Sequence, residues 1–396
     1  MKRVKLTVQY SALQGLYWML FCAIYSFATV FLLEQGFSGT RIGIIVALGN
    51  VLGVVLQPVA GALADNSERI TVGRLITILS AVMLVVLAIL KIVSGALPVV
   101  AVLFILADAL LQILQPLVNS VSVYYMNRGV DLNFGIARGI GSVMYAVVSS
   151  VLGKLVAGYG VSLILYSGII ILTGMMIIIS MMPMREKDSD AKKEACQEEK
   201  NILEFLANYK YFSVVLVGLT LLLLSHNLLN NYMIHIVTPL GGDEAAMGTA
   251  FSIAAMLELP TMFLFSGLVK RIHSERLLMF SGLFFFLKAG AYFLCTNMTQ
   301  IYMTQIFQMG AFALYIPASV YYVNEVMEEQ DKFKGQALMV GTSTLGGVFG
   351  GLLGGVLVDH TGVRQLLFTG VLTAFAGMAL VFVSAGKENK IQKGRD

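Results

Sequence analysis

The sequence predicts an all-α polytopic membrane protein with about twelve transmembrane helices, built as two six-helix bundles that repeat one another. Three observations predict this fold class. The composition is strongly apolar, apolar runs of about twenty residues recur along the chain, and short motifs of the first half return in the same order in the second half.

Composition alone excludes an ordinary soluble domain. Hydrophobic residues make up 57% of the chain, charged residues only 13%, and the mean hydropathy is +0.81. A soluble domain would carry about 25% charged residues. Most of the chain is therefore expected to lie in hydrocarbon.

The apolar runs are each long enough to cross about 30 Å of hydrocarbon as a helix. They are continuous rather than alternating, which indicates helices and not a barrel. The predicted helices cover residues 9–33, 40–64, 72–95, 97–124, 133–157, 161–183, 208–236, 244–269, 275–296, 299–324, 335–358 and 363–385.

One long polar segment, residues 184–204, separates the two apolar halves. Its charges cannot lie in hydrocarbon, so it is expected to be an aqueous linker. The predicted organisation is an N-terminal bundle over 1–183, a cytoplasmic linker over 184–207, a C-terminal bundle over 208–385 and a cytoplasmic tail over 386–396.

Lys and Arg are concentrated in alternate loops, among them the N-terminus, the linker and the tail. Positively charged loops stay on the cytoplasmic side, so both termini are predicted to be cytoplasmic in a multi-pass protein of the cell (inner) membrane. The basic loops suit contact with anionic membrane lipid. Without an aromatic-interleaved basic patch, no nucleic-acid partner is expected.

No metal and no cofactor are expected. The three cysteines, Cys22, Cys196 and Cys295, have no metal-ligand spacing and indicate no disulfide framework. The sequence also offers no nucleophile with its base, no paired-Asp metal motif and no phosphate-cradling glycine loop, so an enzyme is not expected.

Three motif pairs indicate an internal repeat. Residues 122–127 (SVYYMN) return as 319–324 (SVYYVN), 153–161 (GKLVAGYGV) parallels 355–363 (GVLVDHTGV), and 61–65 (GALAD) is echoed more weakly by 267–270 (GLVK). Each pair is short, but their common order predicts two parallel six-helix repeats.

These motifs resemble the major facilitator superfamily. Gly61, Asp65, Arg69 and Arg74 are similar to the superfamily's gating loop between helices two and three. Further segments resemble the lactose-permease-like proton symporters, an oligosaccharide and nucleoside branch: 36–43 with Gln57-Pro58, 133–138, and Ser225-His226 followed by Glu258. The resemblance implies the major facilitator fold, a substrate site between the halves, and transport by rocking.

The resemblance also places Glu258 and Lys288 at the family's paired acid and base positions. A buried carboxylate can take up or release a proton as a neighbouring ammonium moves away or approaches. His226 is a further candidate because imidazole titrates near neutral pH. The family's proton-carrying residues of helix ten correspond roughly to Phe312 and Tyr315 here. A static buried salt bridge is the competing interpretation of the Glu258–Lys288 pair.

Asp108 lies near the centre of the predicted helix 97–124, and Gln112, Gln115 and Asn119 continue its face. An ionised, unpaired carboxylate at that depth is costly, so Asp108 is predicted to be protonated, paired or open to a water-filled cavity. With Glu258 it would carry the proton, while the three amides are candidate solute ligands. A structural hydrogen bond to a neighbouring helix is the alternative.

The first predicted helix has an aromatic-polar face formed by Gln14, Tyr17, Trp18 and Tyr25. Such a face can stack on a planar or sugar ring, and interhelix packing is the alternative. Arg138 matches the basic substrate-contact position of the resembled branch, although Asn119 or Ser120 stands where that pattern has an acid. Arg138 would bind the solute or pair with Asp131.

Two later helices supply the remaining candidate solute ligands. Helix seven is polar near its outer end, with Asn227, Asn230 and Asn231 beside His226, which favours cavity lining. Helix ten presents Gln305, Gln308 and Tyr315 along one face and is expected to break at Pro317.

The predicted function is a proton-coupled secondary transporter that imports a small polar organic solute, such as a sugar or nucleoside, and works as a monomer. Its partners would be the solute, protons and membrane lipid. Proton-coupled efflux of amphiphilic compounds is the alternative within transporters. A non-transporting membrane sensor is a third possibility, but the linker and tail are too short for an output domain.

Overall fold

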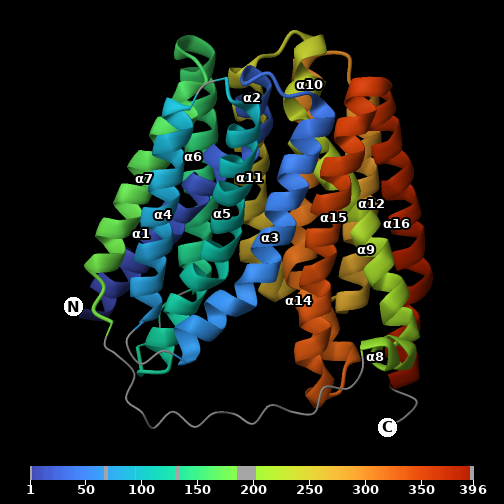
Figure 1. The fold of residues 1–396 in the computed structure, drawn as a ribbon. Coiled ribbons are helices and arrows are strands. Elements are labelled where there is room, and N and C mark those ends of the chain that lie inside the picture. Colours follow the sequence, from blue (N-terminus) through green and yellow to red (C-terminus); the bar gives the residue numbers. More distant parts are fainter. Residues whose placement is uncertain are drawn as a thin grey trace. The chain divides into compact units, whose positions relative to one another are not determined.

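The computed structural model describes residues 2–66, 70–93, 95–130, 132, 134–184 and 202–392. Within these ranges the regular structure is entirely helical (Figure 1). Contacts divide the chain into two compact units. The first comprises Met1–Lys192 with Gly242–Met256, and the second comprises Lys193–Gly241 with Leu257–Asp396.

The first unit contains the helices of the N-terminal half. They are α1 (Lys2–Phe21), a π-helical turn η1 (Cys22–Ser26), α2 (Ala28–Glu34), α3 (Gly39–Asn66), α4 (Val72–Ile92), α5 (Leu97–Met126), α6 (Phe134–Tyr159) and α7 (Ser162–Ser180). The first half of α11 also belongs to this unit.

The second unit contains α8 (Ile202–Asn208), α9 (Lys210–Asn231), α10 (Met233–Val237), η2 (Thr238–Leu240), the second half of α11 (Glu244–Leu268), α12 (Ser274–Leu294), α13 (Met298–Thr304), η3 (Gln305–Met309), α14 (Phe312–Val326), η4 (Glu329–Asp331), α15 (Lys332–His360) and α16 (Val363–Gln392). Of these, η2, η3 and η4 are short 3₁₀ helices.

Most of the long described helices meet the length and hydropathy that a membrane span requires. Eleven spans do so directly, and the bent pair 4–26 and 28–34 brings the number to as many as twelve. The pair is bent by 42° at Phe27, directly after the wider π-helical turn η1. The chain is therefore a multi-pass membrane protein, and the predicted helical fold class is confirmed.

The two units pack their helices in the same order. In the first unit, α1 packs against α6 and α7, and α4 packs against α5 and α7. In the second unit, α9 packs against α15 and α16, and α12 packs against α14 and α16. Figure 1 shows α9, α15 and α16 side by side. This shared order is what two parallel repeats require.

The repeat extends to backbone conformation. Gly160, after α6, and Gly362, after α15, occupy matching places in the motif pair 153–161 and 355–363. Both have a positive φ, of 96° and 85°. Each glycine ends its helix in the left-handed region, where a side chain would be strained.

The glycine pairs of α15 allow close helix packing, as expected. A methyl group added at Gly346 would lie 2.7 Å from the Leu223 Cβ atom, and one added at Gly354 would lie 2.3 Å from the Tyr232 ring. Small residues let two helices approach to this distance. The ridge therefore holds α15 against α9.

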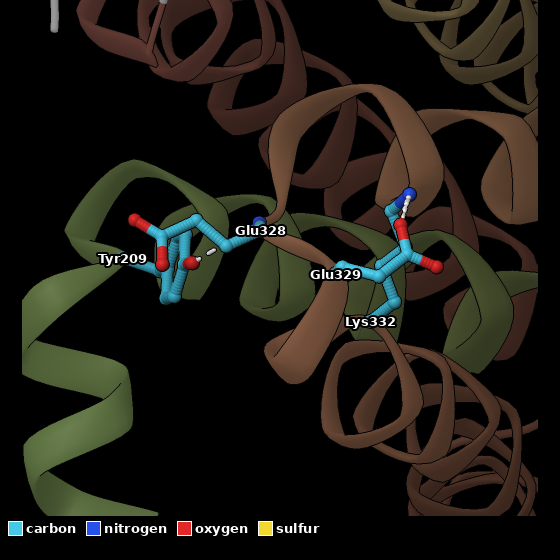
Figure 2. A network of polar contacts seen from close by, with 4 residues as sticks. All are labelled: Tyr209, Glu328, Glu329 and Lys332. Atoms are coloured by element: carbon cyan, nitrogen blue, oxygen red, sulfur yellow. Dashed lines mark hydrogen bonds and ion pairs between the residues drawn. The ribbon is translucent and has the colours of Figure 1, made fainter.

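At the start of α9, Tyr209 ties α8 to the loop before α15. Its hydroxyl donates to Asp331 Oδ2 at 3.1 Å and accepts from the Glu328 amide at 3.5 Å. Figure 2 shows the contact with Glu328 beside the exposed Glu329–Lys332 ion pair, which has 2.6 Å between Nζ and Oε2. Burial raises the pKa of Tyr209 to about 12, so the phenol is a neutral donor at neutral pH.

Candidate functional site

The tenth span is interrupted where its polar side chains lie. The α-helix stops at Thr304, continues as the 3₁₀ helix η3, and resumes at Phe312. Residues three apart eclipse one another in a 3₁₀ helix, so Gln305 and Gln308 project to the same side. The expected break at Pro317 is wrong, because α14 runs through Pro317 without interruption.

Two neighbouring helices donate side-chain hydrogen bonds to backbone carbonyls at the interruption. The Thr261 hydroxyl on α11 donates to the Met309 carbonyl at 2.9 Å, and the Ser281 hydroxyl on α12 donates to the Ala311 carbonyl at 2.9 Å. An unpaired carbonyl in hydrocarbon would cost several kcal/mol. The two hydroxyls therefore stabilise the interruption.

The same helices bring an acid and a base to Gln308. The Gln308 Nε2 atom donates to Glu258 Oε1 at 2.8 Å, and the Lys288 ammonium donates to Gln308 Oε1 at 2.6 Å. All three residues are buried: Glu258 is 9% exposed, Gln308 is 4% exposed and Lys288 is 2% exposed. The predicted acid–base pair thus belongs to one buried network in which the Gln308 amide bridges the two charged groups.

His226 of α9 lies in an aromatic environment beside this network. Its ring stacks on Phe312 with centroids 4.8 Å apart and meets Phe285 edge-on at 5.6 Å. Its Nε2 atom is 2.7 Å from Asn230 Nδ2, and its buried Nδ1 atom has no hydrogen-bond partner within the described residues. The amide nitrogen can only donate, so His226 Nε2 is the acceptor and Nδ1 carries the proton of the neutral ring.

The other predicted ligands of the second unit have mixed environments. Asn227 donates to the Leu223 carbonyl of its own helix at 2.8 Å and faces Gly350 of α15, whereas Asn231 is only partly buried. Tyr315 lies 3.1 Å from the Thr342 hydroxyl. Gln305 donates to the Tyr292 hydroxyl at 2.6 Å, one turn of α12 beyond Lys288.

An apolar groove of about 480 Å³ lies between α9 and α15 in the second unit. Its lining includes Leu216, Thr220, Leu224, Leu338, Leu345 and Phe349. Among the residues that the structure describes, those lining the groove offer apolar contact area and hydroxyl groups but no charged side chain.

In the first unit, a row of aromatic rings follows α1 and η1. Trp18 and Phe21 have centroids 5.3 Å apart, and Phe21 and Tyr25 stack at 4.9 Å. The Arg138 guanidinium lies 3.9 Å from the centre of the Trp18 ring and donates to the Ser142 hydroxyl at 2.9 Å. Trp18 and Tyr25 thus form the partly exposed aromatic face that the sequence predicted.

Gln14 and Tyr17, predicted for the same face, are buried against α5. Gln14 Nε2 donates to Asn119 Oδ1 at 2.9 Å and to the Tyr10 hydroxyl at 2.8 Å, and the Tyr17 hydroxyl donates to the Leu111 carbonyl at 3.3 Å. These contacts fit the packing alternative in this conformation. Their role as solute ligands stays a prediction.

Amides also join α5 to α3. Gln112 Nε2 donates to Asn50 Oδ1 at 2.9 Å, and Gln57 Nε2 donates to the Gln112 carbonyl at 3.1 Å. Asn50 in turn donates to the Tyr25 hydroxyl at 3.5 Å, so the α5 amides reach the aromatic row. Gln115, one turn further along, is partly exposed.

Asp108 is buried at the same helix contact. It is 1% exposed, and neither carboxylate oxygen has a hydrogen-bond partner within the described residues. A methyl group added at Gly49 of α3 would lie 2.3 Å from Asp108 Oδ2. An ionised carboxylate buried in this way is costly, and which of the three predicted states Asp108 adopts stays a prediction.

The predicted gating loop is described only in part. Gly61 lies within α3 with open space around it. Arg74 lies in the first turn of α4, where its amide donates to the Thr71 hydroxyl at 3.2 Å. Arg69 and the side chain of Asp65 lie outside the described residues.

Several structural partners of these residues were missed from the sequence. They are the stacking partner Phe312, the carbonyl partners Thr261 and Ser281, and Gly141, at which an added methyl would lie 2.5 Å from Trp18. The interruption of the tenth span did have a signal in the sequence. This signal is Gly310, directly after η3, because a glycine inside a helical pattern lowers the helix propensity of that segment. Side-chain partners from other helices left no local signal.

Two repeated six-helix halves with acid, base and amide groups buried inside apolar spans define a secondary transporter of the parallel-repeat type. The model of the MFS_1 like family matches residues 9–369. The chain belongs to this family of major facilitator transporters.

Relatives cover nearly the whole chain. The uncharacterized transporter YwbF of Bacillus subtilis (strain 168) is 24% identical over 98% of this chain and 97% of its own length. The maltose permease of Geobacillus stearothermophilus is 25% identical over 93% of this chain and 92% of its own length. The crystal structure of the nucleoside transporter NupG has a TM-score of 0.79 at 15% identity, over 96% of this chain and 98% of that one.

Proposed function

We propose that this transporter is a proton-coupled importer of a small polar organic solute, such as a sugar or a nucleoside. It would work as a monomer by alternating access, in the cell membrane, with both termini cytoplasmic. The names of the maltose permease and of the nucleoside transporter NupG support this solute class. The lysine-rich loops support the orientation.

The observation that carries proton coupling is the buried, amide-bridged pair of Glu258 and Lys288. With Glu258 ionised the network is neutral overall. When Glu258 takes up a proton, an ammonium without a counter-charge is left in a low-dielectric interior, which is costly. Protonation therefore changes the relative energies of the transport conformations, as coupling requires.

The remaining predicted residues have separate roles in this proposal. Asp108 is a second proton carrier in the first unit, and His226, whose Nε2 atom bonds to Asn230, is a third candidate in the second unit. The candidate solute ligands are the aromatic row and Arg138 in the first unit, and the amides of α9 in the second unit. In the cycle, Glu258 is protonated from outside, the solute binds, the protein reorients, the solute leaves, and Glu258 releases its proton to the cytoplasm.

The test is uptake into proteoliposomes. A thermal-shift screen of sugars, nucleosides and aromatic acids first selects the solute. An acidic exterior should then drive its accumulation, and a protonophore should abolish the effect. Glu258→Gln should lose accumulation but keep solute exchange, whereas Glu329→Gln, which removes an exposed carboxylate, should keep both. Equal uptake with and without the pH difference would contradict the proposal.

The apolar groove between α9 and α15 favours a second candidate, proton-coupled efflux of amphiphilic compounds. Its leucine and phenylalanine lining suits an apolar chain better than a sugar. Energised loss of a preloaded amphiphilic dye from cells, reduced by Leu345→Gln in the groove, would support this candidate over import.

A further inference from the structure

Gln308 was predicted as a solute ligand, but its contacts assign it a different task. It is 4% exposed, and both ends of its amide bond to the buried charged side chains. An amide has a donor end and an acceptor end. The donor end faces the acid and the acceptor end faces the base, which is the arrangement that stabilises the ionised form of both.

We propose that Gln308 is a positioning residue that keeps Glu258 and Lys288 apart as a bridged pair and thereby sets the pH at which Glu258 takes up a proton. The inference rests on the proposed function, because it concerns the residue that we propose carries the proton. A direct ion pair would hold the carboxylate ionised more strongly, since Coulomb attraction falls with separation. The interposed amide stabilises the ionised pair less than a direct ion pair would, so Glu258 can still be protonated.

The position of the amide is fixed by the interrupted span. Gln308 lies in η3, whose following carbonyls accept hydrogen bonds from Thr261 of α11 and Ser281 of α12. These are the helices that carry Glu258 and Lys288. The segment that presents the amide is therefore attached to the same two elements as the charges that the amide separates.

The titratable groups around Glu258 come from three other elements. Lys288 and Tyr292 lie on α12, with the Lys288 ammonium 5.8 Å from the centre of the Tyr292 ring. His226 lies on α9, and Tyr315 lies on α14. Lys288 is the group joined to Glu258 through Gln308, so a change at Gln308 alters the carboxyl environment without removing any titratable group.

The decisive variant is Gln308→Met, which keeps the length of the side chain but can neither donate to Glu258 nor accept strongly from Lys288. Loss of both bonds disfavours the ionised pair. Glu258 should then hold its proton to a higher pH, by at least about one pH unit, roughly a tenfold change in proton affinity. Gln336→Met is the matched control, because it makes the same substitution at a partly exposed glutamine outside the network, whose amide donates to the Val320 carbonyl.

The primary readout is infrared difference spectroscopy of the purified protein during a pH titration. The carbonyl stretch of protonated Glu258 is assigned by its loss in Glu258→Gln. A midpoint that moves upward in Gln308→Met and stays in Gln336→Met supports the inference. A midpoint that is unchanged or moves downward in Gln308→Met, or that moves equally in both variants, overturns it.

Transport measurements distinguish a failure of the inference about Gln308 from a failure of the proposed function. In Gln308→Met, solute exchange should persist while pH-driven accumulation falls roughly tenfold or more, because release of the proton into the cytoplasm becomes slow. If the infrared midpoint moves but the unsubstituted protein shows no pH-driven accumulation, Gln308 sets the proton affinity and the proposed function fails. If accumulation is pH-driven and the midpoint does not move, the inference about Gln308 fails alone.

Discussion

The guanidinium of Arg138 lies 3.9 Å from the centre of the Trp18 ring. This contact joins α6 to α1, and it depends on Gly141, where any side chain would collide with the indole. Cation–π contacts at partly buried sites contribute roughly 1–2 kcal/mol. Trp18 is the one tryptophan of the chain, so its fluorescence reports this contact directly.

Replacement of Arg138 by Gln should therefore change the Trp18 emission and abolish any emission change caused by the solute. Steady-state fluorescence of the purified protein measures both. Arg128→Gln is the control, because Arg128 lies at the same 3.9 Å from the Tyr124 ring at an exposed position. A normal solute-dependent signal in Arg138→Gln would remove Arg138 from the proposed solute site.

Gly49→Ala should lower the melting temperature, because the added methyl group would lie 2.3 Å from Asp108 Oδ2 and 2.8 Å from its Cβ atom. Overpacking of this kind costs about 1–3 kcal/mol. Gly61→Ala, on the same helix with open space around it, is the control and should be neutral. Thermal unfolding in detergent compares the three proteins. Equal melting temperatures would mean that α3 and α5 are not packed this closely.

Asp108→Asn should leave the melting temperature unchanged or raise it. The carboxyl group is buried without a hydrogen-bond partner among the described residues, and a neutral amide of the same shape cannot acquire a charge there. Asp108→Leu replaces the carboxyl group by an apolar side chain of similar size, and it tests whether stability depends on a polar group at this position. A marked loss of stability in Asp108→Asn would show that the ionised carboxylate is required.

The bridged pair predicts a strongly non-additive mutant cycle. Glu258→Gln and Lys288→Gln should each destabilise the protein, and Lys288→Gln by about 3–5 kcal/mol, because one buried charge is left uncompensated. The double variant should be more stable than Lys288→Gln alone. Chemical denaturation of the four proteins gives the coupling. Additive losses would indicate that the two charges do not sense each other through Gln308.

Tyr209→Phe should cost about 1 kcal/mol, the net worth of the hydrogen bond to Asp331. Folding raises the pKa of Tyr209 from 10.0 to about 12. The stability from the neutral phenol is therefore complete below pH 10 and is lost as pH rises from 10 to about 12. The melting temperature should fall more steeply over this range in the unsubstituted protein than in Tyr209→Phe.

Local sequence patterns determined the membrane class, the helix positions and the repeat. A long apolar run can be recognised from the sequence alone, because it is buried by the hydrocarbon of the membrane and not by a particular distant residue. Gly160 and Gly362 mark equivalent helix ends, because the positive φ at each position favours glycine. Lys288 and Glu258 were predicted because each is a charged residue inside an apolar run and stands at an acid or base position of the resembled family.

Only the tertiary structure decided which side chains the predicted polar residues contact. No local pattern indicates that Gln308 bonds to both charges, that Asp108 faces a glycine, or that Gln14 and Tyr17 turn into the bundle while Trp18 stays partly exposed. Each of these outcomes depends on side chains from other helices. A buried polar group takes the partner that packing brings within hydrogen-bond distance, and that partner is set by the fold and not by the neighbouring sequence.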